Sequence, residues 1–244
     1  MTTTKEIAVV SGGAQGIGGA TVRRLAEDGF KVLALDLKTD AVEAHAAELR
    51  GEGLDVTGIA CDISNRGAVA AALATLPKVD VAVCAAGMYW PRTFDELVED
   101  DFRRIMEVNL IGVFLLAQEV LKKMGPGGRI IPISSRGAAG GTGFPHYVAS
   151  KAAVVGLVRA MAMELRTRQI AVNSIAPGFT DTAMTRSMPP DQYAASVRLE
   201  PSGRAGDPAD IANAVSFLAS PRTSFITGQI IYVDGGKSLG GLGI

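Results

Sequence analysis

The 244-residue sequence predicts an α/β protein with a doubly wound, seven-stranded parallel sheet and helices on both faces. Short runs rich in Val, Ile and Ala alternate with longer stretches of helical spacing, as in repeated strand–helix units. These runs lack the polar alternation of a half-exposed strand, which indicates that both faces of the sheet are covered. Because no linker or low-complexity tract divides the chain, we expect residues 1–244 to form a single domain.

The expected strands follow one another along the chain, with one long interruption near the end. They are EIAVVS, KVLALDL, LDVTGIACD, VDVAVCAAG, GRIIPISS, IAVNSIAPG and IIYVDGG. The interruption, residues 179–208, contains Pro189, Pro190 and a later Gly/Pro cluster, and it separates the sixth strand from the last helix. Insertions of this length are usually functional, so we expect a lid over a substrate site.

Composition and charge favour a small-molecule partner. The chain is 48% hydrophobic with a formal net charge of −1, so it offers no basic field for nucleic acid or anionic lipid. Its start, MTTTKEIAVVSGG, has only a short apolar run, which predicts neither signal peptide nor membrane span and hence a cytoplasmic protein. Cys61 and Cys84 lie far apart and the histidines are His45 and His146, so we expect no metal site and no disulfide.

A glycine-rich turn follows the first strand, in the stretch SGGAQGIGGATVRRLAEDG. Gly12, Gly16 and Gly18 leave room for a tight turn, for approach of a pyrophosphate and for packing of the next helix on the sheet. The N-terminus of that helix faces the anion. A strand before the glycines and a helix after them predict a dinucleotide site.

Asp36 closes the second strand, where its carboxylate can accept hydrogen bonds from the adenosine ribose hydroxyls. A 2′-phosphate would meet that carboxylate: two unit charges about 4 Å apart repel by about 4 kcal/mol at an effective dielectric of about 20. Neither Gln15 nor Leu37 supplies a compensating cation, although Lys38 is long enough to offset part of the charge. The sequence therefore predicts NAD rather than NADP.

Tyr147 and Lys151 lie four residues apart in SSRGAAGGTGFPHYVASKAAV, where they share one face of an expected helix. Such a pair is either an acid–base device or a solvated aromatic beside a solvated base. Tyrosine, with an ordinary pKa of about 10, is a poor base at neutral pH, and a neighbouring ammonium favours the phenolate. The dinucleotide site in the same chain favours the acid–base interpretation.

These motifs occur in the order typical of the short-chain dehydrogenase/reductase family, which the chain resembles over nearly its full length. The resemblance implies a Rossmann-type domain, a nicotinamide cofactor and reversible oxidation of an alcohol to a ketone or aldehyde. It also implies a homotetramer or homodimer built through the helices expected at 100–124 and 147–168. The supporting stretches are SGGAQGIG, CDIS, EVNLIGVF, ISSRGAAG, YVASKAAV, VNSIAPGFTDTAM and FITGQIIYVDGG.

The resemblance implies a role for each matching residue. Tyr147 is the general acid/base, Lys151 also binds the nicotinamide ribose, and Ser135, chosen over Ser134, holds the substrate oxygen. Asn109 matches the family residue that holds a water in the proton relay; its alternative is a hydrogen-bonded amide that distorts the helix. The implied cofactor-binding set is Gly12, Gln15, Gly16, Ile17, Gly18, Asp36, Leu37, Asp62, Ile63, Ala86, Gly87, Tyr147, Lys151, Pro177, Gly178, Thr180 and Thr182. Thr182 is preferred over Thr180 for the nicotinamide carboxamide.

One stretch departs from the family, and the segments around it are expected to bind the substrate. Cys84-Ala85-Ala86-Gly87 replaces the usual Asn-Asn-Ala-Gly, so two bracing amides are lost and we expect lower local stability or a compensating water. The expected pocket suits a hydrophobic alcohol. Its residues are Tyr89, Trp90, Arg136, Phe144, His146, Met184 and Met188. Arg136 either pairs with a substrate carboxylate or phosphate or is solvated, and His146 either lines the pocket or has no role.

The first functional hypothesis is an NAD-dependent oxidoreductase that interconverts a hydrophobic secondary alcohol and its ketone. The alternative is a 3-oxoacyl thioester reductase. Two features argue against it: the charge of Asp36 disfavours NADPH, and LKKMGPGGRI offers only a modest basic patch for docking an acidic carrier protein. A non-catalytic NAD-binding sensor is the third hypothesis. Because Tyr147 and Lys151 are both present, an enzyme is favoured over the sensor.

Overall fold

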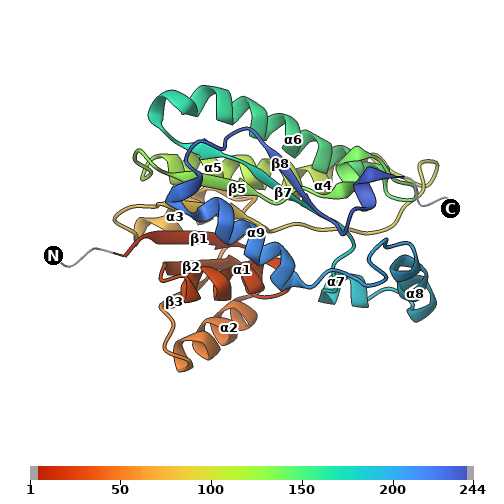
Figure 1. Cartoon of the computed structure of the whole chain (residues 1–244), viewed down its shortest axis with the longest axis horizontal. Helices are drawn as coiled ribbons and strands as arrows, with labels where there is room; N and C mark the ends of the chain where they lie inside the picture. Colours follow the sequence, from red (N-terminus) through yellow and green to blue (C-terminus); the bar gives the residue numbers. More distant parts are fainter. Residues whose placement is uncertain (1–4, 241–244) are drawn as a thin grey trace.

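Six parallel strands form the central sheet, in the order β3-β2-β1-β4-β5-β6 (Figure 1). The computed structural model describes residues 5–240, so the first four residues of the expected single domain and its last four lie outside the described residues. The strands are β1 (Ile7–Ser11), β2 (Lys31–Asp36), β3 (Val56–Ala60), β4 (Val81–Cys84), β5 (Arg129–Pro132) and β6 (Ala171–Val172). β7 (Ser174–Pro177) and β8 (Ile230–Val233) pair with each other in a separate parallel sheet.

The prediction of a seven-stranded sheet is therefore wrong by one strand, and the cause lies at Asn173. The run IAVNSIAPG was expected as one strand, but it is divided into β6, which pairs with β5, and β7, which pairs with β8. The Asn173 side chain donates to Ile226 O at 2.7 Å and accepts from Gln229 N at 3.0 Å, so it holds the approach to β8 against this strand. A single bridge between Ile133 and Ile175 still joins the two sheets.

Helices cover both faces of the sheet and enclose two hydrophobic cores (Figure 1). One core is closed by α1 (Gly16–Glu27), α2 (Thr39–Gly51) and α9 (Pro208–Ala219), the other by α3 (Arg66–Ala74), α5 (Gly112–Leu121) and α6 (Pro145–Leu165). Successive strand residues alternate between the cores: Val9 belongs to one and Val10 to the other. This double burial explains why the strands read as continuous apolar runs.

The expected helix at 100–124 contains an irregular turn. α4 (Glu99–Met106) continues through a π-helical turn, Glu107–Ile111, into α5. Wider turns of this kind occur often at functional sites because they displace a side chain from the regular helical spacing. Here the turn carries Asn109.

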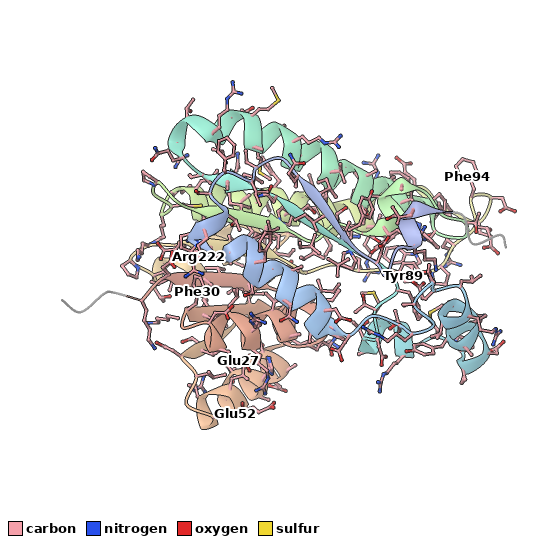
Figure 2. The ribbon with its side chains drawn as sticks, viewed as in Figure 1. Glu27, Phe30, Glu52, Tyr89, Phe94 and Arg222 are labelled. Atoms are coloured by element: carbon pink, nitrogen blue, oxygen red, sulfur yellow. The ribbon has the colours of Figure 1, made fainter. Side chains whose placement is uncertain are left out.

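The order of the strands reverses between β1 and β4, so the loops at their carboxyl ends separate and leave a crevice. The expected lid contains α7 (Ala183–Arg186) and α8 (Pro190–Arg198), which lie beyond this end of the sheet (Figure 1). Tyr89 lies towards the same end, whereas Phe30 and Arg222 lie towards the other (Figure 2). Short 3-10 turns occupy Arg136–Ala139, Arg166–Arg168, Pro221–Thr223 and Lys237–Leu239. Within residues 5–240, none of the helices has the length and apolar character needed to cross a membrane.

Candidate active site

A cleft of about 660 Å³ follows the carboxyl ends of the strands. It begins at the glycine turn between β1 and α1, passes Asp36 at the end of β2 and reaches Tyr147 on α6. The lid segment lines its other wall with Thr182, Met184 and Met188. Every residue of the expected cofactor-binding set lines this one cleft, together with Ser135.

The glycine turn is closed by backbone packing that excludes side chains. A Cβ on Gly18 would lie 2.0 Å from Gly12 O, and a Cβ on Gly12 would lie 2.8 Å from the backbone of Ala86. Gly12 and Gly16 also have positive φ angles of 68° and 56°, which favour glycine. The turn therefore brings bare backbone and the N-terminus of α1 to the cleft, and these features fit the pyrophosphate of a dinucleotide.

Two carboxylates stand at the other end of this half of the cleft. Asp36 accepts hydrogen bonds from Ala14 N and Lys38 N, both at 3.2 Å, so its carboxylate is fixed at the end of β2. Asp62 accepts from Ser64 N at 2.9 Å and from Ser64 Oγ at 2.6 Å. Both line the cleft beside Ile63, an arrangement that fits the adenosine end of a dinucleotide.

The two neighbouring serines after β5 have different partners. Ser134 is buried and its Oγ donates to Lys151 O at 3.0 Å, which ties the strand end to α6. Ser135 is partly exposed to the cleft, and its Oγ accepts from Gly137 N at 2.9 Å, which leaves its proton free to donate. Burial raises the pKa of Tyr147, and the neighbouring Ser135 hydroxyl offsets part of that rise. The hydroxyl beside Tyr147 is thus that of Ser135.

Lys151 lies one helical turn after Tyr147 and is buried behind it. Its Nζ is 5.8 Å from the centre of the Tyr147 ring and donates to Ile133 O at 2.9 Å. Burial lowers the pKa of Lys151 to about 8. A Cβ on Gly87 would lie 3.4 Å from this Nζ and 3.3 Å from Asn109 Oδ1, so Gly87 lies directly beside the ammonium.

Asn109 does not line the cleft; its side chain braces the loop that does. Its Oδ1 accepts from Met88 N at 2.8 Å, and its Nδ2 donates to Met88 O at 3.0 Å and to Ser150 Oγ at 3.1 Å. The side chain is fully buried at the π-helical turn. This geometry matches the hydrogen-bonded amide that distorts a helix, and the water-holding role stays a prediction.

The Thr residues of the lid segment differ in exposure. Thr180 is buried and its Oγ1 donates to Gly178 O at 3.2 Å. Thr182 lies at the N-terminus of α7, where its Oγ1 accepts from Thr185 N at 3.4 Å, and its methyl group would contact a Cβ placed on Gly16. Thr182 therefore has the more accessible hydroxyl, facing the glycine turn.

The expected substrate pocket is only partly assembled. Tyr89, Arg136, Phe144, Met184 and Met188 line the cleft. Tyr89 packs edge-on against Tyr147, with ring centres 5.2 Å apart, and against Phe144, with ring centres 5.6 Å apart. These rings give the catalytic end an apolar wall.

Trp90 and His146 are outside the set of described residues that line the cleft, so the expectation for them is wrong. Their ring centres lie 4.8 Å apart with the ring planes tilted by 57°, and His146 is fully buried at the start of α6. Neither ring nitrogen of His146 has a hydrogen-bond partner among residues 5–240. Burial lowers the pKa of His146, with Asp101 opposing that change and Arg92 adding to it.

Sequence reasoning missed three features of the cleft. Glu200 and Lys237 form an ion pair in its wall, between the end of the lid and the turn after β8. Ser11, buried in β1, accepts from Ala86 N at 3.2 Å and so braces the loop where the family amides are lost. Phe179 and Leu199 add apolar surface from the lid. No local pattern marks Ser11, Glu200 or Lys237, because each acts through a partner distant in sequence.

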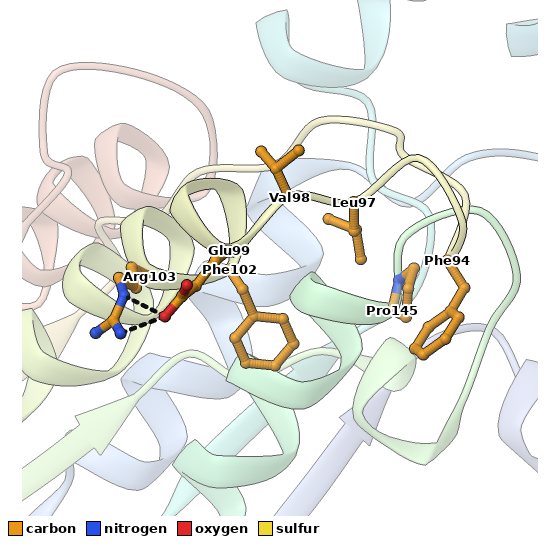
Figure 3. A pocket seen from close by; sticks show the side chains of 7 residues that line it. All are labelled: Phe94, Leu97, Val98, Glu99, Phe102, Arg103 and Pro145. Carbon is orange, nitrogen blue, oxygen red and sulfur yellow. Dashed lines mark hydrogen bonds and ion pairs between the residues drawn. The ribbon is translucent and has the colours of Figure 1, made fainter.

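A second hollow, of about 540 Å³, lies before α4 and at the start of α6 (Figure 3). Its lining is mostly apolar, and Glu99 and Arg103 pair with each other there (Figure 3). It contains no free acid–base group and is separate from the nucleotide cleft. The apolar residues that line it are Phe94, Leu97, Val98, Phe102 and Pro145.

The doubly wound sheet, the glycine turn and the Tyr147/Lys151 pair on one cleft define a dinucleotide-dependent oxidoreductase. Residues 12–238 match the family model described as enoyl-(acyl carrier protein) reductase. The chain belongs to the short-chain dehydrogenase/reductase family, whose members bind a nicotinamide cofactor. Among residues 5–240, no group of three His, Cys, Asp or Glu side chains is placed to hold a metal.

Curated relatives match the chain over almost its whole length. The (2S)-[(R)-hydroxy(phenyl)methyl]succinyl-CoA dehydrogenase subunit BbsD of Thauera aromatica is 38% identical, over 96% of both chains. The 3-oxoacyl-[acyl-carrier-protein] reductase FabG of Vibrio cholerae is 36% identical, over 95% of this chain and 96% of that one. The cis-4-hydroxycyclohexanecarboxylate dehydrogenase of Sinomonas cyclohexanicum is 37% identical, over 95% and 96%. A solved structure of an actinorhodin polyketide ketoreductase variant with NADPH gives a TM-score of 0.88 at 30% identity, over 96% of this chain and 97% of that one.

Proposed function

We propose that the protein interconverts a 3-hydroxyacyl thioester and the corresponding 3-oxoacyl thioester. The observation that carries the proposal is the placement of Ser135, Tyr147 and Lys151 at the end of the cleft that begins at the glycine turn. The names of the relatives support a thioester-bound alcohol as the substrate class. Two of the relatives are named for thioesters, one carried by coenzyme A and one by a carrier protein. The thioester alternative therefore has better support than the first hypothesis of a simple hydrophobic alcohol.

In the oxidation direction, Ser135 donates a hydrogen bond to the substrate hydroxyl oxygen and Tyr147 removes the hydroxyl proton. Lys151, whose Nζ lies 5.8 Å from the centre of the Tyr147 ring, would favour the phenolate through its positive charge. The bound nicotinamide supplies the two-electron acceptor for this chemistry. In the reduction direction, Tyr147 returns the proton to the carbonyl oxygen.

For the cofactor we propose NAD. The Asp36 carboxylate, held by two backbone N–H groups, is placed to accept hydrogen bonds from the ribose hydroxyls and to repel a 2′-phosphate. Lys38 lines the same end of the cleft, and no hydrogen bond or ion pair of its ammonium is found within residues 5–240. The solved relative with NADPH makes this preference worth measuring directly.

A homotetramer or homodimer is our proposal for the assembly. Three large apolar side chains are exposed on the helices implied by the family resemblance: Phe102 at 41%, Ile111 at 37% and Met163 at 66%. A second copy packed against α4, α5 and α6 would cover them. Light scattering after size exclusion tests this, with Met163→Asp expected to lower the measured mass.

A carboxylated cyclic alcohol is the second candidate substrate. The apolar wall of Tyr89 and Phe144 fits a ring, and one relative is named for 4-hydroxycyclohexanecarboxylate. This candidate is still a secondary alcohol, as in the first hypothesis, but it carries a carboxylate instead of being purely hydrophobic.

Parallel assays decide between these functions. Purified protein is supplied with 3-hydroxybutyryl-CoA, with cis-4-hydroxycyclohexanecarboxylate and with cyclohexanol, each with NAD and with NADP. We expect the highest kcat/KM for the thioester with NAD. A clear preference for cyclohexanol, which is uncharged like the acyl part of 3-hydroxybutyryl-CoA, would overturn the thioester proposal, and silence with all three would favour the non-catalytic sensor.

A further inference from the structure

Arg136 places an unpaired positive charge at the catalytic end of the cleft. It directly follows Ser135, begins the 3-10 turn Arg136–Ala139 and lines the cleft. Its side chain is partly buried. Within residues 5–240, its guanidinium has no hydrogen bond and no ion pair, although it carries five N–H donors.

The other cationic side chains that line the cleft either lie at its adenosine end or already have a hydrogen-bond or ion-pair partner. Lys237 pairs with Glu200, and Lys151 donates to Ile133 O. Lys38 lies beside Asp36, at the adenosine end. Of the described residues that line the catalytic end, Arg136 is thus the one with an unused positive charge.

A guanidinium that is partly withdrawn from water without an acceptor is unfavourable, and an anion that enters the cleft relieves this cost. The planar fork of arginine matches the two oxygens of a carboxylate, which a single point charge does not. Ser135 is the proposed donor to the substrate oxygen, so the reacting carbon lies next to Ser135. Because Arg136 directly follows Ser135, an anion bound by Arg136 lies near that carbon. The anion therefore belongs to the part of the substrate that carries the hydroxyl group.

We propose that Arg136 binds a carboxylate on the acyl part of the substrate. This inference rests on the proposed function and narrows it: the substrate is a hydroxy acid whose second carboxyl group is free, such as the monothioester of a 3-hydroxy diacid. The phosphates of coenzyme A or of a carrier protein lie at the far end of the pantetheine arm, away from the reacting carbon. The carboxylate is bound and stays unchanged, while the alcohol proton passes to Tyr147; the nicotinamide, when bound, would supply the hydride acceptor.

The test compares substrates of the same shape and different charge. The first pair is the N-acetylcysteamine monothioester of 3-hydroxyglutarate and the thioester of 3-hydroxy-5-methylhexanoate, in which an isopropyl group replaces the carboxylate. The second pair is cis-4-hydroxycyclohexanecarboxylate and 4-isopropylcyclohexanol, which contain no thioester. Wild type, Arg136→Gln and Arg136→Lys are assayed on all four. Arg222→Gln is the control, because Arg222 is exposed and lies far from the cleft (Figure 2).

We expect the wild type to prefer the carboxylated member of a pair by about 10- to 100-fold in kcat/KM, as for hydrogen bonds to a charged group. Arg136→Gln should abolish the preference and Arg136→Lys should restore part of it, while Arg222→Gln leaves it intact. If only the cyclic pair is turned over with this pattern, the thioester proposal fails and the carboxylate inference stands.

Four results would overturn the inference. The wild type would show no preference for the carboxylated substrates, or Arg136→Gln would slow both members of each pair equally. A rise in KM for NAD alone would assign Arg136 to the cofactor instead. Finally, replacing N-acetylcysteamine by coenzyme A on the neutral acyl group adds phosphates to the substrate. If this replacement raises kcat/KM in the wild type and does not raise it in Arg136→Gln, Arg136 binds phosphate.

Discussion

The two halves of the cleft are built on different principles. The adenosine half, from the glycine turn to Asp62, is made of backbone packed too closely for side chains and of carboxylates fixed by backbone N–H groups. The catalytic half relies on side chains from β5, α6 and the lid, which meet across long sequence distances. Cofactor binding therefore depends on local geometry, whereas chemistry and specificity depend on tertiary contacts. Substitutions can therefore separate the two halves.

The largest separation is expected from Tyr147→Phe. The change removes the group that exchanges a proton with the substrate, so kcat should fall by about 10²- to 10⁴-fold. NAD binding, followed by fluorescence titration, should change little because the glycine turn and Asp36 are untouched. Tyr232→Phe, at an exposed tyrosine of β8, is the matched control. Wild-type kcat in the Tyr147→Phe protein would refute the mechanism.

A smaller effect distinguishes the neighbouring serines. Ser135→Ala removes the donor to the substrate oxygen, and kcat/KM should fall by about 100-fold with unchanged stability. Ser134→Ala removes the hydrogen bond to Lys151 O, so the free energy of unfolding should fall by about 1 kcal/mol. Its effect on kcat/KM should be much smaller than that of Ser135→Ala. Steady-state kinetics and denaturant titration of both variants check this. The reverse pattern would assign the substrate oxygen to Ser134.

Asp36→Ala acts on the adenosine half alone. Removing the carboxylate ends its repulsion of a 2′-phosphate, so the ratio of kcat/KM for NAD to that for NADP should fall by about tenfold or more. The ratio of kcat/KM for two substrates with a fixed cofactor should stay constant. An unchanged cofactor ratio would show that Asp36 does not select NAD.

The smallest effect is a dependence of stability on pH that originates at Lys151. Burial lowers its folded-state pKa to about 8 from the ordinary value of 10.5. Between these pH values the unfolded chain binds more protons than the folded one, so the free energy of unfolding rises with pH. Burial raises the pKa of Cys61, Cys84 and Tyr147, which lowers the free energy of unfolding over the same range in any variant that keeps them. In denaturant titrations without cofactor, the change in the free energy of unfolding from pH 8 to pH 10 should therefore be more positive by about 1–2 kcal/mol in the wild type than in Lys151→Met. Equal changes in both proteins would place the titrating group elsewhere.

The same contrast between local and distant contacts explains how far the sequence predicts the structure. The strands and the glycine turn follow from short-range patterns, so their positions could be predicted, although some expected runs are too long: VDVAVCAAG covers residues 79–87, whereas β4 is Val81–Cys84. The division at Asn173 could not, because it depends on a side chain that contacts residues 226–229. Neither the apolar runs nor the family resemblance predicted that β7 and β8 pair with each other outside the six-stranded sheet.

In the catalytic half, the residues that belong to a sequence motif were predicted, whereas those positioned by tertiary packing were not. Tyr147 and Lys151 share a helix face, so their proximity follows from spacing alone. His146 adjoins Tyr147 in sequence, but on the helix it turns away from the cleft and packs against Trp90. The Glu200–Lys237 pair joins two loops whose proximity only the folded chain creates.

The partners of Ser134 and Ser135 also bear on how enzymes of this kind diversify. Consecutive residues of an extended chain point to opposite sides, so one hydroxyl serves the framework while its neighbour faces the substrate. Substitutions on the cleft side, at Ser135 or at Arg136 in the 3-10 turn that follows, can therefore leave intact the hydrogen bond by which Ser134 ties the chain after β5 to α6. A new substrate preference can arise here by one or two substitutions while the inherited scaffold stays intact.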